Sequence, residues 1–221
     1  MSKFYEISHK GHTNDNHGNS KKSIIEAINF NYDMIEMDVQ LCKSGEIILY
    51  HDVYINNKYI YELSYEEIHA FDSSIVKLSD ILTITDTYNK PVYLDLKGKG
   101  PIVYKLIQLL DGMNINYNNI WIASFNYNHL IDLILLRKEN RSYKIGFITS
   151  NNFSFNILYE VKFNLDFIAI DWQIASKKFV DECHHYQTLL FVYTCKNINE
   201  LTLITTNINP DGIVTNIKIK H

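Results

Sequence analysis

The sequence lacks the cysteine pairs and long apolar runs that mark secreted and membrane proteins. Its three cysteines, Cys42, Cys183 and Cys195, form no CxxC pair, and their odd number argues against a fully paired disulfide framework. No stretch approaches the ~18 consecutive apolar residues of a membrane span. The N-terminus lacks the apolar region of a signal peptide. We therefore expect a cytoplasmic protein, in a reducing compartment, without a transmembrane segment.

The charge pattern lacks the basic patch or stripe of a nucleic-acid-binding surface. The formal net charge is -4, and acidic and basic residues are interspersed along the chain, so we expect no nucleic-acid partner. The 221 residues contain no linker or low-complexity tract, and 46% of them are hydrophobic, which is enough for a sizeable core. We expect a single domain over residues 1–221. The sequence leaves the oligomeric state open.

Short apolar runs alternate with amphipathic stretches along the whole chain, a pattern typical of βαβ units and a parallel sheet. The runs that predict strands are Tyr5–Ser8, Met34–Val39, Ile47–Tyr50, Val92–Leu96, Ile120–Ala123, Lys144–Ile148, Phe167–Ile170, Leu189–Tyr193 and Gly212–Thr215. The stretches that predict helices are Ser20–Phe30, Leu78–Tyr88, Ile102–Leu110, His129–Lys138, Phe155–Phe163, Phe179–Tyr186 and Ile198–Thr205, with a shorter helix over Ser64–Phe71.

One of the nine predicted strands does not fit the alternation. The gap between Val39 and Ile47 is too short for the crossover of a dozen or more residues that parallel neighbours need. Its Lys-Ser-Gly core indicates a hairpin turn, so Ile47–Tyr50 should return antiparallel to the second strand. The remaining eight repeats predict an α/β fold, a closed (β/α)8 TIM barrel with a short hairpin excursion after the second strand.

Two of the predicted strands carry charged side chains at alternate positions. Glu36 and Asp38 point to one face of their strand, and Asp95 and Lys97 share one face of another. Buried carboxylates need a partner. Carboxylate oxygens suit Mg²⁺ or Ca²⁺ better than zinc, with Mn²⁺ as a further candidate. The alternative is a purely structural network in which Lys97 and Lys10 pair with these acids.

Two histidines fall where the barrel would place catalytic groups, at the C-terminal ends of strands. His9 ends the first strand, and His51 follows the hairpin return. Two imidazoles can supply a general base and a general acid near neutral pH, and a cation with a lysine can stabilise an anionic centre. Phosphodiester cleavage needs this combination. We interpret two other histidines, His12 and His129, as solvated residues without a catalytic role.

Seven short motifs in order resemble those of the glycerophosphodiester phosphodiesterase family, in the phosphatidylinositol-phosphodiesterase-like TIM-barrel superfamily. They run from residue 7 to residue 216 and therefore cover nearly the whole chain. They are His9-Lys10-Gly11, Glu36-Met37-Asp38-Val39, Lys43 to Asp52, Asp95-Leu96-Lys97, Ser124-Phe125-Asn126, Phe191 to Asn197 and Gly212 to Asn216.

The resemblance implies a metal-dependent phosphoric diester hydrolase. It would cleave a small glycerophosphodiester to glycerol 3-phosphate and an alcohol. The roles that it implies are an acid/base pair and a metal site, with further contacts to phosphate or substrate. By this resemblance, His9 and His51 would be the acid/base pair. Glu36, Asp38 and Asp95 would bind the metal, and Lys10, Lys97 and Tyr193 would contact the phosphate or the substrate. Tyr193 is either a wall for the alcohol group or rim packing, and the assignment of acid and base to the two histidines stays open.

The sequence departs from the family pattern at several positions, including Tyr193, which replaces a tryptophan, and Gly18-Asn19-Ser20, which lacks a glutamate of the family segment. Lys10 replaces an arginine, so a bidentate fork becomes a point charge. Asp95 replaces a glutamate, and Asn216 replaces an aspartate. These changes leave two alternatives open. One is phospholipase D-like cleavage of lysophospholipids or sphingomyelin, and the other is a non-catalytic descendant that binds phosphate or metal.

Overall fold

The computed structural model describes residues 4–12, 18–137, 141–151 and 165–219. Eight parallel strands form a closed ring, because β1 (Tyr5–Ser8) pairs with both β11 (Gly212–Thr215) and β2 (Met34–Leu41). Between these lie, in order around the ring, β10 (Leu189–Cys195), β9 (Phe167–Asp171), β8 (Lys144–Thr149), β7 (Ile120–Ser124) and β6 (Val92–Leu96). The predicted TIM barrel is confirmed.

The ninth predicted strand lies outside the ring, as the short gap before it requires. β3 (Ile47–Leu49) pairs antiparallel with the end of β2. It is followed by a small hairpin that the sequence analysis missed, β4 (Tyr54–Ile55) and β5 (Lys58–Tyr59). Asn56 and Asn57 form its turn, both with positive φ, 48° and 61°, as a tight two-residue hairpin turn demands.

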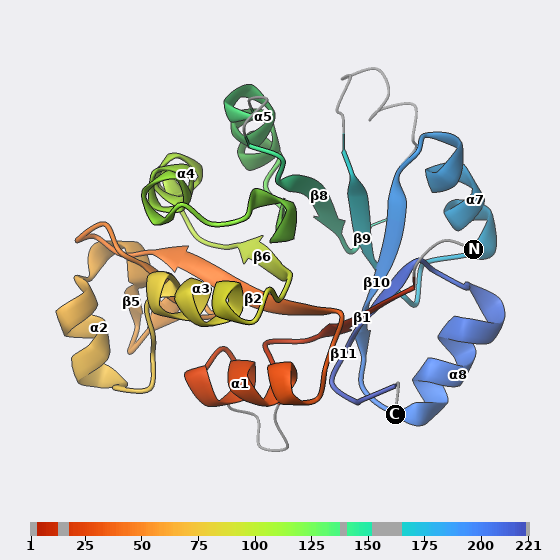
Figure 1. Cartoon of the computed structure of the whole chain (residues 1–221), viewed down its shortest axis with the longest axis horizontal. Coiled ribbons are helices and arrows are strands. Elements are labelled where there is room, and N and C mark those ends of the chain that lie inside the picture. Colours follow the sequence, from red (N-terminus) through yellow and green to blue (C-terminus); the bar gives the residue numbers. More distant parts are fainter. Residues whose placement is uncertain (1–3, 13–17, 138–140, 152–164, 220–221) are drawn as a thin grey trace.

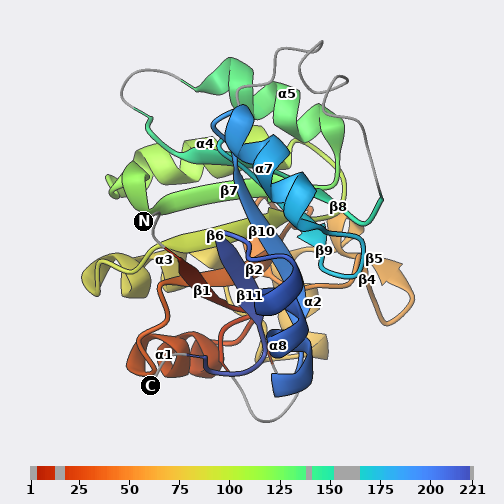
Figure 2. The same cartoon turned by 90° about the vertical axis from the view of Figure 1, so that its right-hand side faces the viewer.

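Helices surround the strand ring (Figures 1 and 2). Their bounds are α1 (Lys21–Asn29), α2 (Tyr65–Phe71), α3 (Leu78–Thr87), α4 (Ile102–Met113), α5 (Tyr127–Leu136), α7 (Lys177–His185) and α8 (Ile198–Asn207), with short 3-10 turns at Ile60–Glu62 and Tyr117–Asn119. The predicted helix Phe155–Phe163 lies outside the described residues. In the part of the chain that the structure describes, no helix is long and apolar enough to cross a membrane.

Aromatic side chains fill much of the barrel interior. Tyr93, Trp121, Phe167 and Phe191 pack together with smaller residues from the other strands. Gly146 makes this possible, because a Cβ at this position would lie 2.2 Å from the Phe167 ring. These rings fill the interior of the barrel. The charged side chains that point inwards from the described strands therefore lie at its C-terminal mouth.

Two histidines that we expected to be solvated are buried. His12 is 8% exposed and lies 2.9 Å from the Tyr32 hydroxyl, with its ring packed against Phe30. His129 is 7% exposed and lies 2.9 Å from the Ser124 hydroxyl. The prediction was wrong for both, because each ring has a hydroxyl partner that satisfies one nitrogen inside the protein.

Candidate active site

Three carboxylates meet at the C-terminal mouth of the barrel. Glu36 and Asp38 come from β2 and Asp95 from β6, and each offers one oxygen within 4.8 Å of the others. The strand register explains this proximity, since Asp38 and Asp95 are direct partners in the pairing of β2 with β6. All three are buried, with exposed fractions of 5%, 1% and 6%. The predicted convergence of the three acids is therefore present in the structure.

The donor set fits a hard divalent cation. Two oxygens bound to one Ca²⁺ at about 2.3–2.6 Å can be no more than about 5 Å apart, which the three acids satisfy. Asp95 Oδ1 is buried and has no hydrogen-bond partner among the described residues. Burial and the neighbouring Asp38 and Asp95 raise the pKa of Glu36 well above its ordinary value. An acid cluster under such repulsion is suited to binding a cation.

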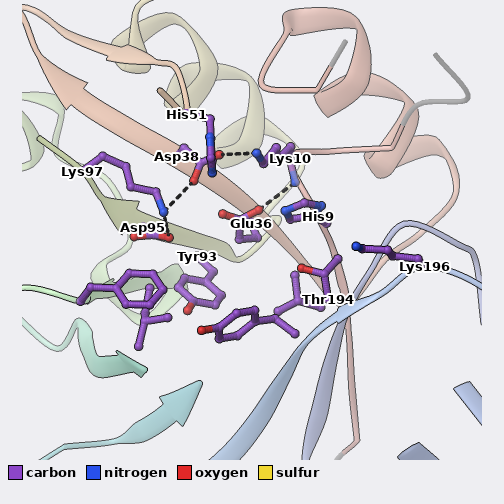
Figure 3. Close-up of a pocket in the computed structure, with 14 residues that line it drawn as sticks. His9, Lys10, Glu36, Asp38, His51, Tyr93, Asp95, Lys97, Thr194 and Lys196 are labelled. Carbon is purple, nitrogen blue, oxygen red and sulfur yellow. Dashed lines mark hydrogen bonds and ion pairs between the residues drawn. The ribbon is translucent and has the colours of Figure 1, made fainter. Parts of the chain in front are cut away.

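Two lysines form ion pairs with the acids at the edge of the cluster (Figure 3). Lys97 Nζ lies 2.5 Å from Asp95 Oδ2 and 3.3 Å from Asp38 Oδ1, and Lys10 Nζ lies 3.3 Å from Asp38 Oδ2. Burial alone would raise the pKa of Asp38, but Lys97 and Lys10 outweigh it and lower the value. For Asp95, burial outweighs Lys97 and raises the pKa to about 6. The lysines thus compensate Asp38 more fully than Asp95.

Asn19 fixes the orientation of Asp38, and the sequence analysis gave it no role. Its amide donates to Asp38 Oδ2 at 2.8 Å, and its Oδ1 accepts from the Asp38 backbone N–H at 3.1 Å. The residue has φ +58°, a left-handed conformation in which asparagine is enriched. Lys10 contributes through its backbone as well, because its N–H donates to Glu36 Oε2 at 2.8 Å.

Both predicted catalytic histidines line the same pocket of about 330 Å³ as the three acids. His9 Nδ1 donates to the amide oxygen of Asn216 at 2.7 Å. Burial lowers the pKa of His9 to about 4, although the bond to Asn216 acts in the opposite direction. His51 is more exposed, and its Nδ1 lies 2.7 Å from Asp52 Oδ1. In both rings the Nδ1 atom is engaged, which leaves Nε2 for proton transfer.

The opposite wall of this pocket comes from β10 and the loop after β7. The Tyr193 hydroxyl donates to the Thr149 carbonyl at 2.9 Å, and its ring meets the Phe125 ring edge-on at 6.3 Å. Tyr193 therefore is a pocket wall and is also packed against the rim. Lys196, which the sequence analysis did not single out, also lines the pocket, and its signal was only a lysine directly after the β10 strand.

Comparisons with known proteins agree with this architecture. The family model of the glycerophosphoryl diester phosphodiesterase family matches residues 9–111, which contain all three acids and both histidines. No curated protein sequence matches the chain.

Three solved structures illustrate the shared fold. A phosphodiesterase from Oleispira antarctica, in complex with the product sn-glycerol-3-phosphate, has a TM-score of 0.82 at 17% identity and covers 97% of this chain and 93% of its own. A glycerophosphodiester phosphodiesterase from Parabacteroides distasonis has a TM-score of 0.82 at 18% identity, and the match covers 99% of this chain and 94% of that one. A glycerophosphodiester phosphodiesterase from Thermotoga maritima has a TM-score of 0.75 at 16% identity, and the match covers 98% of this chain and 96% of that one. Over residues 9–111 the chain is therefore similar to the glycerophosphoryl diester phosphodiesterase family, and over nearly its whole length it shares the fold of these three phosphodiesterase structures.

Proposed function

We propose that this protein hydrolyses glycerophosphodiesters to glycerol 3-phosphate and an alcohol in a metal-dependent reaction. The observation that carries the proposal is the position of three convergent carboxylates and two histidines on one pocket. The product sn-glycerol-3-phosphate in the similar Oleispira antarctica phosphodiesterase supports the choice of substrate.

Glu36, Asp38 and Asp95 would hold the metal ion, Mg²⁺ or Ca²⁺, with Mn²⁺ as a further candidate. Such an ion polarises a phosphoryl oxygen and offsets the negative charge that develops on it. Lys97 and Lys10 would add positive charge at the same oxygens, since their ammonium groups already lie at the edge of the acid cluster. Tyr193 would contact the substrate as part of the opposite wall.

His9 is suited to be the general base. Its Nδ1 hydrogen is committed to Asn216, so the neutral ring presents a lone pair at Nε2. A pKa of about 4 keeps this ring neutral at pH 7. It would accept the proton of the attacking hydroxyl, which is either a water or the neighbouring hydroxyl of the substrate's glycerol. His51, oriented by Asp52, would then donate a proton from Nε2 to the leaving alkoxide.

A substrate panel with and without EDTA tests this proposal. Purified protein would be assayed with glycerophosphocholine, glycerophosphoethanolamine and glycerophosphoglycerol in Mg²⁺, Ca²⁺ or Mn²⁺. We expect turnover that EDTA abolishes and that His9→Ala and His51→Ala each reduce by about 10²–10⁴-fold. His69→Ala is the matched control, because His69 is an exposed histidine on α2 far from the acids in sequence. Failure to cleave any of the three diesters with any of the three metals would refute the proposal.

A further inference from the structure

A second pocket, of about 210 Å³, lies beside the acidic one and has no role in the proposed reaction. We call it the side pocket. Its walls are mostly aliphatic and aromatic, and they come from the end of β2, the β4–β5 hairpin region and the loop after β6. The lining residues are Gln40, Leu41, Val53, Tyr59, Tyr61, Glu62, Gly98 and Lys99.

Three separate chain segments run from the acidic pocket into the side pocket. On β2, Asp38 lines the first and Gln40, the next residue on the same face, lines the second. In the loop after β3, His51 lines the first and Val53 the second. After β6, Lys97 lines the first, and Gly98 and Lys99 line the second. The two pockets are therefore neighbours across His51 and Lys97.

The side pocket is built rather than incidental. The Gln40 side-chain amide donates to the carbonyls of Tyr50 and Asp52, at 3.0 and 2.5 Å, and so ties the His51 loop to the end of β2. Gly100 leaves room for the Tyr61 ring, because a Cβ at this glycine would lie 2.4 Å from that ring.

The Tyr59 ring is also held in place, and its surroundings decide which kind of group fits. It packs against Tyr54 with ring centroids 4.2 Å apart, and Lys99 Nζ lies 5.0 Å from its centroid. A quaternary ammonium group would seek such a ring face, but the Lys99 ammonium already lies there. Glu62 also lines the pocket, so its carboxylate balances the charge of Lys99 and leaves no net charge that would favour a second cation. A neutral apolar group, by contrast, removes Leu41, Val53 and Tyr61 surface from water.

The volume sets the size of the occupant. An engineered apolar cavity of about 150 Å³ takes up benzene, and the side pocket, at about 210 Å³, is larger. It has room for a phenyl ring or a short alkyl chain.

We propose that the side pocket binds the apolar alkyl or aryl part of the leaving alcohol of a phosphodiester substrate. The inference rests on the proposed function, because the phosphate must lie at the three acids. The leaving oxygen then lies beside His51, and its substituent passes between His51 and Lys97 into the side pocket.

A series of sn-glycero-3-phospho esters of methanol, ethanol, propanol and butanol tests the proposal. Burial of each methylene is worth about 0.8 kcal/mol, so kcat/KM should rise roughly two- to fourfold per methylene in the wild type. Tyr61→Ala and Val53→Asp should flatten this rise, with the largest loss of kcat/KM for the butyl ester and the smallest for the methyl ester, since neither residue lines the acidic pocket. Tyr88→Ala, at an exposed tyrosine that ends α3, should leave the slope unchanged.

The outcomes separate the two proposals. No cleavage of any ester refutes the proposed function. Cleavage with a flat series, an unchanged slope in Tyr61→Ala and Val53→Asp, or an equal loss for every ester in these variants refutes the side-pocket proposal. Faster cleavage of glycerophosphocholine than of the butyl ester also refutes it, because the pocket would then prefer a cation.

A binding measurement provides a second readout that needs no turnover. Benzyl alcohol added to the protein in EDTA should shift the backbone amide NMR signals of Val53, Tyr61, Gly98 and Lys99, and Val53→Asp should abolish these shifts. Shifts elsewhere with none at these residues would overturn the proposal.

Discussion

Glu36 is expected to destabilise the metal-free protein, and Glu36→Gln tests this directly. The carboxyl is 5% exposed and lies beside Asp38 and Asp95, while its main compensation is the Lys10 backbone N–H at 2.8 Å. Glutamine keeps the shape and an oxygen that can accept that hydrogen bond, and it removes the charge. In EDTA at pH 7, we therefore expect Glu36→Gln to be more stable than the wild type.

The size of the gain has an upper bound. The wild type avoids the buried charge by protonating Glu36. Protonation at pH 7 of a carboxyl with the ordinary pKa of 4.5 costs at most about 3 kcal/mol, at about 1.36 kcal/mol per pH unit. A gain of about 2–3 kcal/mol would raise Tm by roughly 4–12 °C in a chain of this size. Thermal unfolding followed by circular dichroism, with exposed Glu66→Gln as the control, measures it.

The pH dependence has a defined sign. Folding raises the pKa of Glu36, so the folded state binds this proton more tightly and loses stability as pH rises from about 4.5 towards the raised value. The advantage of Glu36→Gln should vanish near pH 4 and grow towards pH 7. In excess Ca²⁺, the wild type should be more stable than Glu36→Gln, because only the wild type keeps all three carboxylates. This reasoning is contradicted if Glu36→Gln is less stable than the wild type in EDTA. It is also contradicted if Ca²⁺ raises the Tm of Glu36→Gln as much as it raises the Tm of the wild type.

Three further substitutions probe the neighbours of the acids. Asn216→Asp should raise the pKa of His9 from about 4 and move the acidic limb of kcat/KM upward by about 1–2 pH units; an unmoved limb in the pH–rate profile would argue against His9 as the base. Asn19→Ala should weaken Ca²⁺ binding by about 10–100-fold in calorimetry, whereas Asn114→Ala, which has a similar positive φ away from the site, should leave it unchanged. Lys97→Met should destabilise the protein in EDTA by about 3–5 kcal/mol, because it leaves the buried Asp95 without its lysine partner and Asp38 with Lys10 alone. Urea unfolding that shows no loss would contradict the last prediction.

The barrel was predictable because its strands are buried on both faces and therefore read as continuous apolar runs. All nine runs are strands, with ends that shift by up to two residues. The acids were equally visible, since Glu36 and Asp38 interrupt such a run at i and i+2. A charge inside a buried strand is costly unless it has a partner, and this makes it stand out in a sequence.

The parts that were missed depend on loop conformation. Asn19 reaches Asp38 only because its backbone takes a left-handed conformation, and an asparagine in a polar loop carries no sign of its partner. The β4–β5 hairpin had a signal in Asn56-Asn57 between Tyr54-Ile55 and Lys58-Tyr59, but strands of two residues are too short for alternation to be read. The side pocket could not be predicted for the same reason.

The structure also explains why two departures from the family pattern are compatible with the site. At position 10, the contact to Glu36 comes from the backbone N–H, which lysine supplies as well as arginine does. At position 95, the aspartate is one methylene shorter than a glutamate. It nevertheless brings an oxygen within 4.8 Å of those of Glu36 and Asp38, because the strand register sets Asp95 directly beside Asp38. The acid cluster is therefore fixed by strand pairing and backbone contacts, and side-chain length at these two positions is secondary to both.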